Sequence, residues 1–142
     1  MDAKLEVTID VIVHATEDIS KFFESFEEMF EIKQEEFTVE HTTGHFENPI
    51  TLLNVKIEKT QAQKFVGKLI QLLSKDQINE MIQEIEERTV DSTFHIRLDK
   101  QELIKGNLMF KEKDAIKLKI YTPIYNKKDT VKIFRKIFQF VN

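Results

Sequence analysis

Histidines are the side chains in this sequence best suited to acid–base or metal chemistry. The chain has four of them, at positions 14, 41, 45 and 95, and it has no cysteine. His14, His45 and His95 could form an acid–base or metal site with Asp99 if the fold brought them together. The alternative is that each histidine ends a strand or lies in a turn and bonds to nearby backbone. No pair of carboxylates has metal-ligand spacing, so we expect no bound metal and rank a histidine- or metal-dependent nuclease low.

Motifs that hold nucleotides or activate nucleophiles are absent from the sequence. It has no glycine-rich phosphate loop, no Walker-type lysine, no HExxH and no GxSxG, and only 3 glycines are present. Backbone cradles for phosphates depend on glycine, because only glycine lets the backbone approach the ligand closely. We therefore expect a protein that is not an enzyme, with no catalytic residues and no cofactor.

Composition places the chain among globular proteins. Of its 142 residues, 41% are hydrophobic and 32% are charged, which is enough apolar surface to offset the entropy of folding. No apolar run approaches the ~18 residues of a membrane span, and the first residues do not resemble a signal peptide. We expect one domain over residues 1–142 in the cytoplasm, with no membrane partner and with a homodimer as an open alternative.

Charge is distributed unevenly along the chain. Residues 1–95 carry 9 Lys and Arg against 20 Asp and Glu, whereas residues 96–142 carry 12 against 5, although the net charge is only -4. A basic segment in an acidic chain points to a polyanionic partner. The alternative is that the acidic and basic elements meet in the fold and neutralise each other.

The basic side chains fall at spacings that put them on common surfaces. Thr93, His95 and Arg97 alternate along one expected strand, and Lys117, Lys119 and Tyr121 alternate along another. Beyond these lie further cations in and before the last expected helix: Lys127, Lys128, Lys132, Arg135 and Lys136. Cations neutralise phosphates and an aromatic ring stacks on a base, so this combination suits single-stranded RNA. The alternatives are a lysine-rich solvated face and an ion pair of Arg97 with Asp99 or with a glutamate.

Periodicity predicts an α+β fold. Alternation indicates strands over residues 4–16, 33–42, 50–58, 92–98, 107–111 and 115–121. Helical spacing indicates helices over 17–30 and over about 129–141. It also indicates two helices or one bent helix over about 60–85, with Thr16, Thr60 and either Ser74 or Asp76 as caps. The expected order is β-α-β-β-α-α-β-β-β-α. It favours a mostly antiparallel sheet with helices packed on one face.

Three short strings go beyond composition. They are Val13-His14-Ala15-Thr16-Glu17-Asp18, Gly44-His45-Phe46-Glu47-Asn48-Pro49-Ile50 and Phe94-His95-Ile96-Arg97-Leu98-Asp99-Lys100-Gln101. In this order and spacing the chain resembles, over nearly its whole length, an archaeal family known as RNA-binding protein or predicted exosome subunit. It departs from the family pattern at Glu47, where a small residue, usually glycine, is expected.

The resemblance implies a fold similar to the ribosomal large-subunit protein that binds the smallest ribosomal RNA. It also implies an RNA-related role beside the exosome or the ribosome. Together with the basic surfaces, it gives a set of candidate RNA-binding residues: His14, Thr16, His45, Asn48, His95, Arg97, Lys100, Gln101, Lys117, Lys119, Tyr121, Lys132, Arg135 and Lys136. We expect the three strings to cluster on one surface.

The sequence leaves two principal interpretations. The leading one is a non-catalytic RNA-binding protein whose basic patch is local, because the overall negative charge repels RNA at long range. The second is a protein-interaction subunit of an RNA-processing assembly, in which the acidic segment 17–31 or an exposed strand edge docks a partner.

Overall fold

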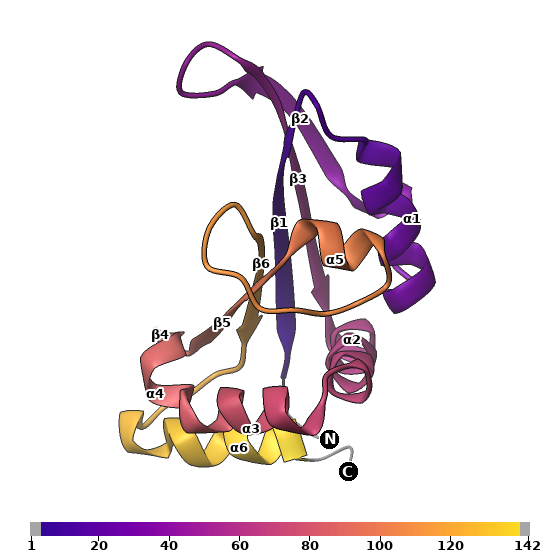
Figure 1. Ribbon diagram of the computed structural model, residues 1–142. Coiled ribbons are helices and arrows are strands. Elements are labelled where there is room, and N and C mark those ends of the chain that lie inside the picture. The colour runs from indigo at the N-terminus through magenta and orange to yellow at the C-terminus, as the bar shows by residue number, and fades with distance from the viewer. Residues whose placement is uncertain (1–3, 140–142) are drawn as a thin grey trace. The chain divides into compact units, whose positions relative to one another are not determined.

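The computed structural model describes residues 4–139 and contains one six-stranded sheet in the order β2-β3-β1-β6-β5-β4 (Figure 1). The strands are β1 (Glu6–His14), β2 (Thr38–Thr43), β3 (Pro49–Glu58), β4 (Thr89–Val90), β5 (Thr93–Leu98) and β6 (Ile116–Tyr121). The helices are α1 (Ile19–Phe30), α2 (Lys59–Leu72), α3 (Lys75–Gln83), α4 (Ile85–Arg88), α5 (Lys100–Ile104) and α6 (Thr130–Gln139), with short 3-10 helices η1 (Gln34–Glu36) and η2 (Lys127–Asp129). The predicted α+β class with a mostly antiparallel sheet is confirmed.

Contacts within the chain define two compact units, each built from segments far apart in the sequence. We call them the α1 unit (Thr8–Lys56 and Arg97–Leu118) and the α6 unit (Met1–Val7, Ile57–Ile96 and Lys119–Asn142, of which residues 4–139 are described). Four strands contribute residues to both units. The expectation of one domain over residues 1–142 stays a prediction.

The α1 unit forms where alternation and helical spacing both bury phenylalanine and aliphatic side chains. Every second residue of β1 is buried, which is the signature of a strand with one face in the core. Helix α1 starts at Asp18, whose carboxylate accepts a hydrogen bond from the Ser20 backbone N–H at 3.0 Å. The rings of Phe23 and Phe26 then pack on Phe37, with centroids 5.5 and 5.4 Å apart.

The α6 unit gathers the remaining helices and a second aromatic cluster. Ser74 caps α3 in a reciprocal capping box with Gln77. Helix α6 contacts both α3 and α4. Its Phe134 and Phe138 rings are buried against Phe94 of β5, with centroids 5.6 and 4.8 Å from that ring. This packing fixes which side of α6 faces water.

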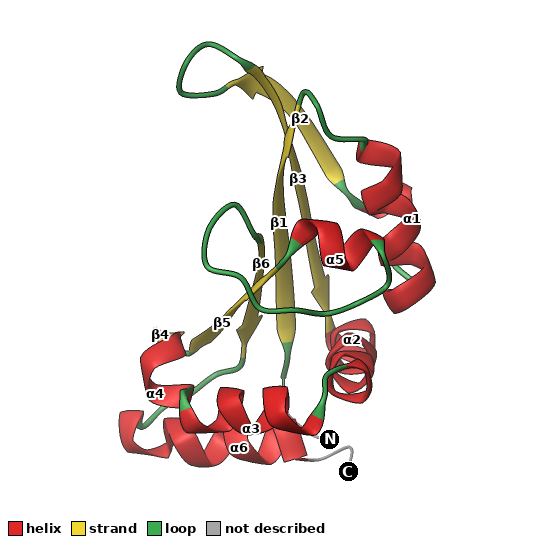
Figure 2. Cartoon of the chain, viewed as in Figure 1, coloured by secondary structure: helices red, strands yellow, loops and turns green. Residues whose placement is uncertain are grey.

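The region after β5 differs from the prediction. Residues 107–111 do not form a hairpin with the last strand; instead Phe110 bridges Leu98 at the end of β5, and Asp99 donates its backbone N–H to the Met109 carbonyl at 2.8 Å. Between the expected strands 92–98 and 107–111, where no element was expected, lies α5, which Asp99 caps by accepting from the Glu102 N–H at 3.0 Å. Figure 2 shows the long loop that joins α5 to β6.

Several element boundaries also differ. Asp18 rather than Thr16 caps α1, and Glu58 rather than Thr60 precedes α2 without a side-chain cap. The short elements α4 and β4 were not expected. The last helix ends at Gln139 in the described part of the chain, so its predicted extension to residue 141 lies outside the described residues.

Candidate nucleic-acid interface

The basic part of the chain consists of two segments that differ in how many acidic residues accompany their cations. Residues 119–142 carry 6 Lys and Arg against a single acid, whereas residues 97–118 carry 6 against 4. Within residues 4–139, five of the cations in the first segment make no ion pair or side-chain hydrogen bond: Lys127, Lys128, Lys132, Arg135 and Lys136. All five are exposed. We call them the α6 basic face.

Most cations of residues 97–118 are already occupied. Lys105 lies 3.5 Å from Glu102, and Lys111 lies 3.8 Å from Asp99. Arg97 donates from Nη1 to the Glu112 backbone carbonyl at 3.0 Å, rather than pairing with Asp99. Exposed lysines occur elsewhere in the described chain, among them Lys113 and Lys117 of this segment, but the α6 basic face groups five cations without partners within residues 127–136.

Helical geometry aligns this face. Lys132 is three residues before Arg135 and four before Lys136, so their side chains share one side of α6, opposite the buried Phe134, Ile137 and Phe138. Like charges at these spacings repel and cost a few tenths of a kcal/mol each. Lys127 and Lys128 precede the helix N-terminus, where positive charge opposes the helix dipole. Local stability does not favour this arrangement, and a bound polyanion would offset the repulsion between the cations.

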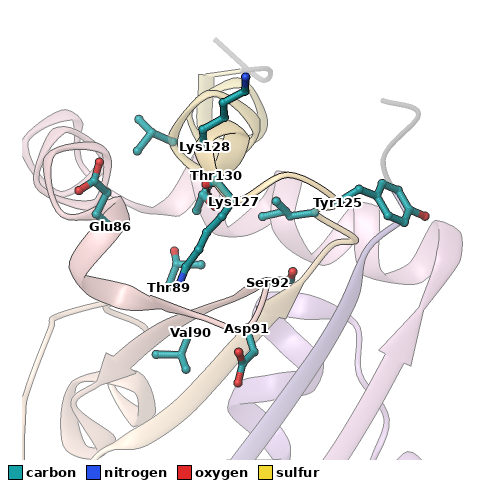
Figure 3. Close-up of a pocket in the computed structure, with 11 residues that line it drawn as sticks. Glu86, Thr89, Val90, Asp91, Ser92, Tyr125, Lys127, Lys128 and Thr130 are labelled. Carbon is teal, nitrogen blue, oxygen red and sulfur yellow. Dashed lines mark hydrogen bonds between the residues drawn. The ribbon is translucent and has the colours of Figure 1, made fainter.

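A pocket of about 720 Å³ opens next to the start of α6. It lies between η2, α6 and the β4–β5 turn, and its lining includes Thr89, Asp91, Ser92, Tyr125 and Lys127. In Figure 3 the Lys127 ammonium points toward Thr89, whereas Lys128 points away from it. The β4–β5 turn has two residues with positive φ, Asp91 (49°) and Ser92 (67°), the conformation of a tight hairpin turn.

Tyr125 stands at one end of this pocket and is 96% exposed (Figure 3). An aromatic ring left almost wholly in water forgoes its burial energy, so such a ring on a basic surface is suited to stacking on a ligand. Sequence reasoning missed Tyr125, because its exposure depends on the loop between β6 and η2. Its position two residues before Lys127 was the available signal.

Lys100 does not lie on the surface, and the expectation that it contacts phosphates there is wrong. Its side chain is only 3% exposed. Its ammonium donates to the Ile12 carbonyl, to Glu17 Oε1 at 3.0 Å and to Asp114 Oδ1 at 2.9 Å. A buried ammonium needs such partners, because burial of an unpaired charge is very costly.

His14 joins the network around the buried Lys100 ammonium from its partly exposed side. Its Nε2 lies 2.9 Å from Asp114 Oδ1, and its backbone N–H donates to Glu17 at 2.8 Å. Burial of the Asp114 carboxyl raises its pKa, but the hydrogen bonds from Lys100 and His14 outweigh this effect and hold the pKa below its usual value. The network ties the end of β1 and the start of α1 to α5 and to the loop before β6.

The network links the first string to the end of the third string within the α1 unit. His14 and Glu17 belong to the first string and Lys100 to the third. A small pocket of about 210 Å³ is lined by His14, Glu17, Pro49 and Ile50, the last two from the second string. The first and second strings meet at this pocket, whereas Phe94, His95 and Ile96 of the third string belong to the α6 unit, so the clustering of all three strings on one surface stays a prediction.

His45 and Asn48 lie in the exposed turn between β2 and β3. The His45 ring contacts the Phe46 ring edge-on at 4.9 Å, and Asn48 accepts the Gly44 N–H at its carbonyl at 2.6 Å. Glu47 has a φ of 60°, a left-handed conformation that favours glycine. The departure from the family pattern thus falls at a position whose backbone conformation favours glycine.

The other candidates divide between the two units. Thr16, Gln101 and Lys117 are exposed in the α1 unit, whereas His95, Lys119 and Tyr121 are half-buried on strands of the α6 unit. Among residues 4–139, no group of three His, Asp or Glu side chains is arranged to hold a metal ion. In the same range, no helix has both the length and the apolar character needed to cross a membrane.

Fold and site together define a small α+β protein with a local basic surface suited to a polyanion. The chain belongs to the RNA-binding family, which matches it over residues 6–122. It is 36% identical over 121 residues to the RNA-binding protein PAB1135 of Pyrococcus abyssi, covering 80% of this chain and 79% of that protein. It is 34% identical over 137 residues to an uncharacterized protein of Methanocaldococcus jannaschii, covering 89% and 91%.

Solved structures agree with this assignment. Protein AF2318 of Archaeoglobus fulgidus superposes with a TM-score of 0.81 at 28% identity, covering 94% of this chain and 99% of that one. Mth689 of Methanothermobacter thermautotrophicus superposes with a TM-score of 0.78 at 26% identity, covering 97% and 100%.

Proposed function

We propose that this protein is a non-catalytic RNA-binding protein that holds single-stranded RNA on the α6 basic face and the adjoining pocket. The observation that carries the proposal is the grouping of five exposed cations without partners within residues 127–136, in a chain of net charge -4. Membership of the RNA-binding family and the similarity to PAB1135 support RNA binding itself; the placement on the α6 basic face rests on the charge pattern, because the family match covers residues 6–122.

The chemistry of the pocket favours an unpaired nucleotide over a duplex. Lys127 and Lys128 can neutralise consecutive phosphates, while the exposed Tyr125 ring can stack on a base that is not already stacked in a helix. The carboxylates of Glu86 and Asp91 also line the pocket. They repel phosphate, so the phosphates should follow the α6 side and the bases should face the β4–β5 turn.

We include in this proposal an association with exosome or ribosome components, which the family resemblance implies. In that setting the protein need not bind RNA tightly by itself, because neighbouring subunits raise the effective RNA concentration at the basic face. Co-purification from an archaeal extract treated with ribonuclease tests the association separately from direct RNA binding.

Photo-cross-linking to a single-stranded RNA tests the site directly. A 12-nucleotide RNA containing 4-thiouridine is irradiated with the full chain at low salt, and the cross-linked peptides are identified by mass spectrometry. We expect cross-links in residues 119–139, with Tyr125 among the labelled positions. Cross-links concentrated in residues 34–58, or no cross-link at low salt, would overturn the proposal.

A duplex of the same sequence is the matched ligand control. Stacking on Tyr125 requires an unstacked base, so the duplex should bind more weakly than the single strand at the same salt concentration. Equal affinity for both would show that only phosphate charge is recognised.

A further inference from the structure

Strand β2 forms an open edge of the sheet in the α1 unit. All six of its residues are exposed, and its one neighbour among the described strands is β3. In an edge strand, every second residue points its backbone N–H and C=O away from the sheet. We propose that β2 binds an extended basic segment of another protein, which adds to the sheet as a further strand.

The edge lacks the features that normally prevent such pairing. Proteins protect exposed edges with lysine, proline, bulges or very short strands. The sequence of β2, Thr38-Val39-Glu40-His41-Thr42-Thr43, has no lysine and no proline. It pairs with β3 in an unbroken register from Thr38 opposite Asn54 to Thr43 opposite Pro49. A regular edge of this length is a template for strand addition.

Charge selects the kind of partner. Residues 8–56, which contain the edge and the acidic helix α1, carry 11 Asp and Glu against 3 Lys. Glu40 lies on β2 itself, and Glu47 lies in the turn that follows it. RNA phosphates and a second copy of the same acidic edge are both repelled by this surface, whereas a lysine- or arginine-rich strand is attracted to it.

Two exposed apolar side chains supply contact area beyond the backbone hydrogen bonds. Val39 on β2 is 42% exposed, and Phe46 at the tip of the β2–β3 hairpin is 88% exposed. The tip is held in shape by the hydrogen bond from the Gly44 N–H to the Asn48 carbonyl. An added strand that runs past Thr43 can therefore cover Phe46. This surface lies in the α1 unit and uses none of the residues of the proposed RNA site.

A synthetic peptide series tests the proposal without changing the protein. The probe is a ten-residue peptide alternating lysine with valine, and its binding is followed by NMR amide shifts of the full chain. Two further versions are N-methylated on alternate amides, one on each edge of the peptide. We expect shifts confined to residues 38–48, and at least about tenfold weaker binding for one methylated version but not for the other, because strand addition uses the amides of a single edge.

Charge variants provide the second measurement. Glu40→Lys should weaken binding of the lysine–valine peptide and strengthen binding of a glutamate–valine peptide. The matched change Glu87→Lys, at an exposed acid of α4 in the α6 unit, should leave the affinity for both peptides unchanged. No shifts at millimolar peptide, or equal loss with both methylated versions, would refute strand addition. Shifts at residues 38–43 that persist without the lysines would refute the basic partner.

Discussion

The salt dependence of RNA binding gives the sharpest test of the α6 basic face. Each phosphate neutralised on a single strand contributes about -0.7 to the slope of log K against log salt. With its five unpaired cations each matched to one phosphate, the face predicts a slope of about -3.5. Raising monovalent salt from about 50 to about 200 mM should then weaken binding by roughly a hundredfold.

A double variant and a matched control test whether the salt dependence arises from the α6 basic face. Lys132→Gln with Lys136→Gln leaves three cations and should reduce the slope to about -2.1, so that the same salt step costs only about twentyfold. Lys105→Gln with Lys111→Gln removes the same charge from cations already paired with Glu102 and Asp99, and should leave the slope near that of the unaltered protein. Fluorescence anisotropy of a labelled single-stranded RNA measures all three slopes. If the two double variants have equal slopes, the reasoning from unpaired cations is refuted.

Four further outcomes follow from the described side chains. Tyr125→Ala should weaken single-stranded RNA binding by about 1–3 kcal/mol while Tyr125→Phe retains it, measured by the same anisotropy assay; equal losses would exclude stacking. Lys100→Met should lower the free energy of unfolding, measured in urea, by about 3–5 kcal/mol, because it leaves the Glu17 carboxylate without its buried cation. Asp114→Asn changes a largely exposed group and should lower it by no more than about 1 kcal/mol. The reverse order would contradict the assignment of Lys100 as the centre of the network. Because the pKa of Asp114 is lowered in the folded protein, its ion pair is fully stabilising at pH values above its ordinary pKa of 3.8, and this contribution should disappear as the pH falls through the lower folded-state pKa. The free energy of unfolding of Asp114→Asn, measured in urea, should therefore depend less on pH in that range. The same pH dependence for the variant and the unaltered protein would count against the ion pair. Glu47→Gly should raise the free energy of unfolding by up to about 1 kcal/mol, since glycine adopts the left-handed φ of 60° without strain, and a destabilised variant would show that the Glu47 side chain has a structural role.

Long periodic segments were predictable because their burial pattern is local. β1 alternates along its whole length, and α3 begins with the Ser74 capping box that the sequence displays. Helix α5 escaped prediction although it carries a similar signal, with Asp99 as the cap and Glu102 at the third helical position. The prediction that residues 107–111 pair with the last strand was wrong for another reason. The segment does alternate, but it pairs with the end of β5, and alternation does not identify the partner of a strand.

In the candidate site, too, residues placed by local geometry were predictable and residues placed by the tertiary fold were not. Helical spacing identified Lys132, Arg135 and Lys136 as one face, because a helix fixes neighbours within the chain. Lys100 looked like another surface cation, because lysine is rarely buried. Its carboxylate partners Glu17 and Asp114 are 83 and 14 residues away, and only the tertiary fold brings them together. The pairing of Lys111 with Asp99, which precedes it by twelve residues, is likewise a tertiary property.

The discontinuity of both units has a consequence for synthesis on the ribosome. β1 and α1 emerge early, yet the α1 unit also needs residues 97–118, and Lys100 can shed its water only when Glu17 and Asp114 are both in place. The nascent first half therefore lacks α5, which contacts α1, until residues 97–118 have been translated. Such a polypeptide should depend on holding chaperones during translation more than a chain whose N-terminal half folds by itself.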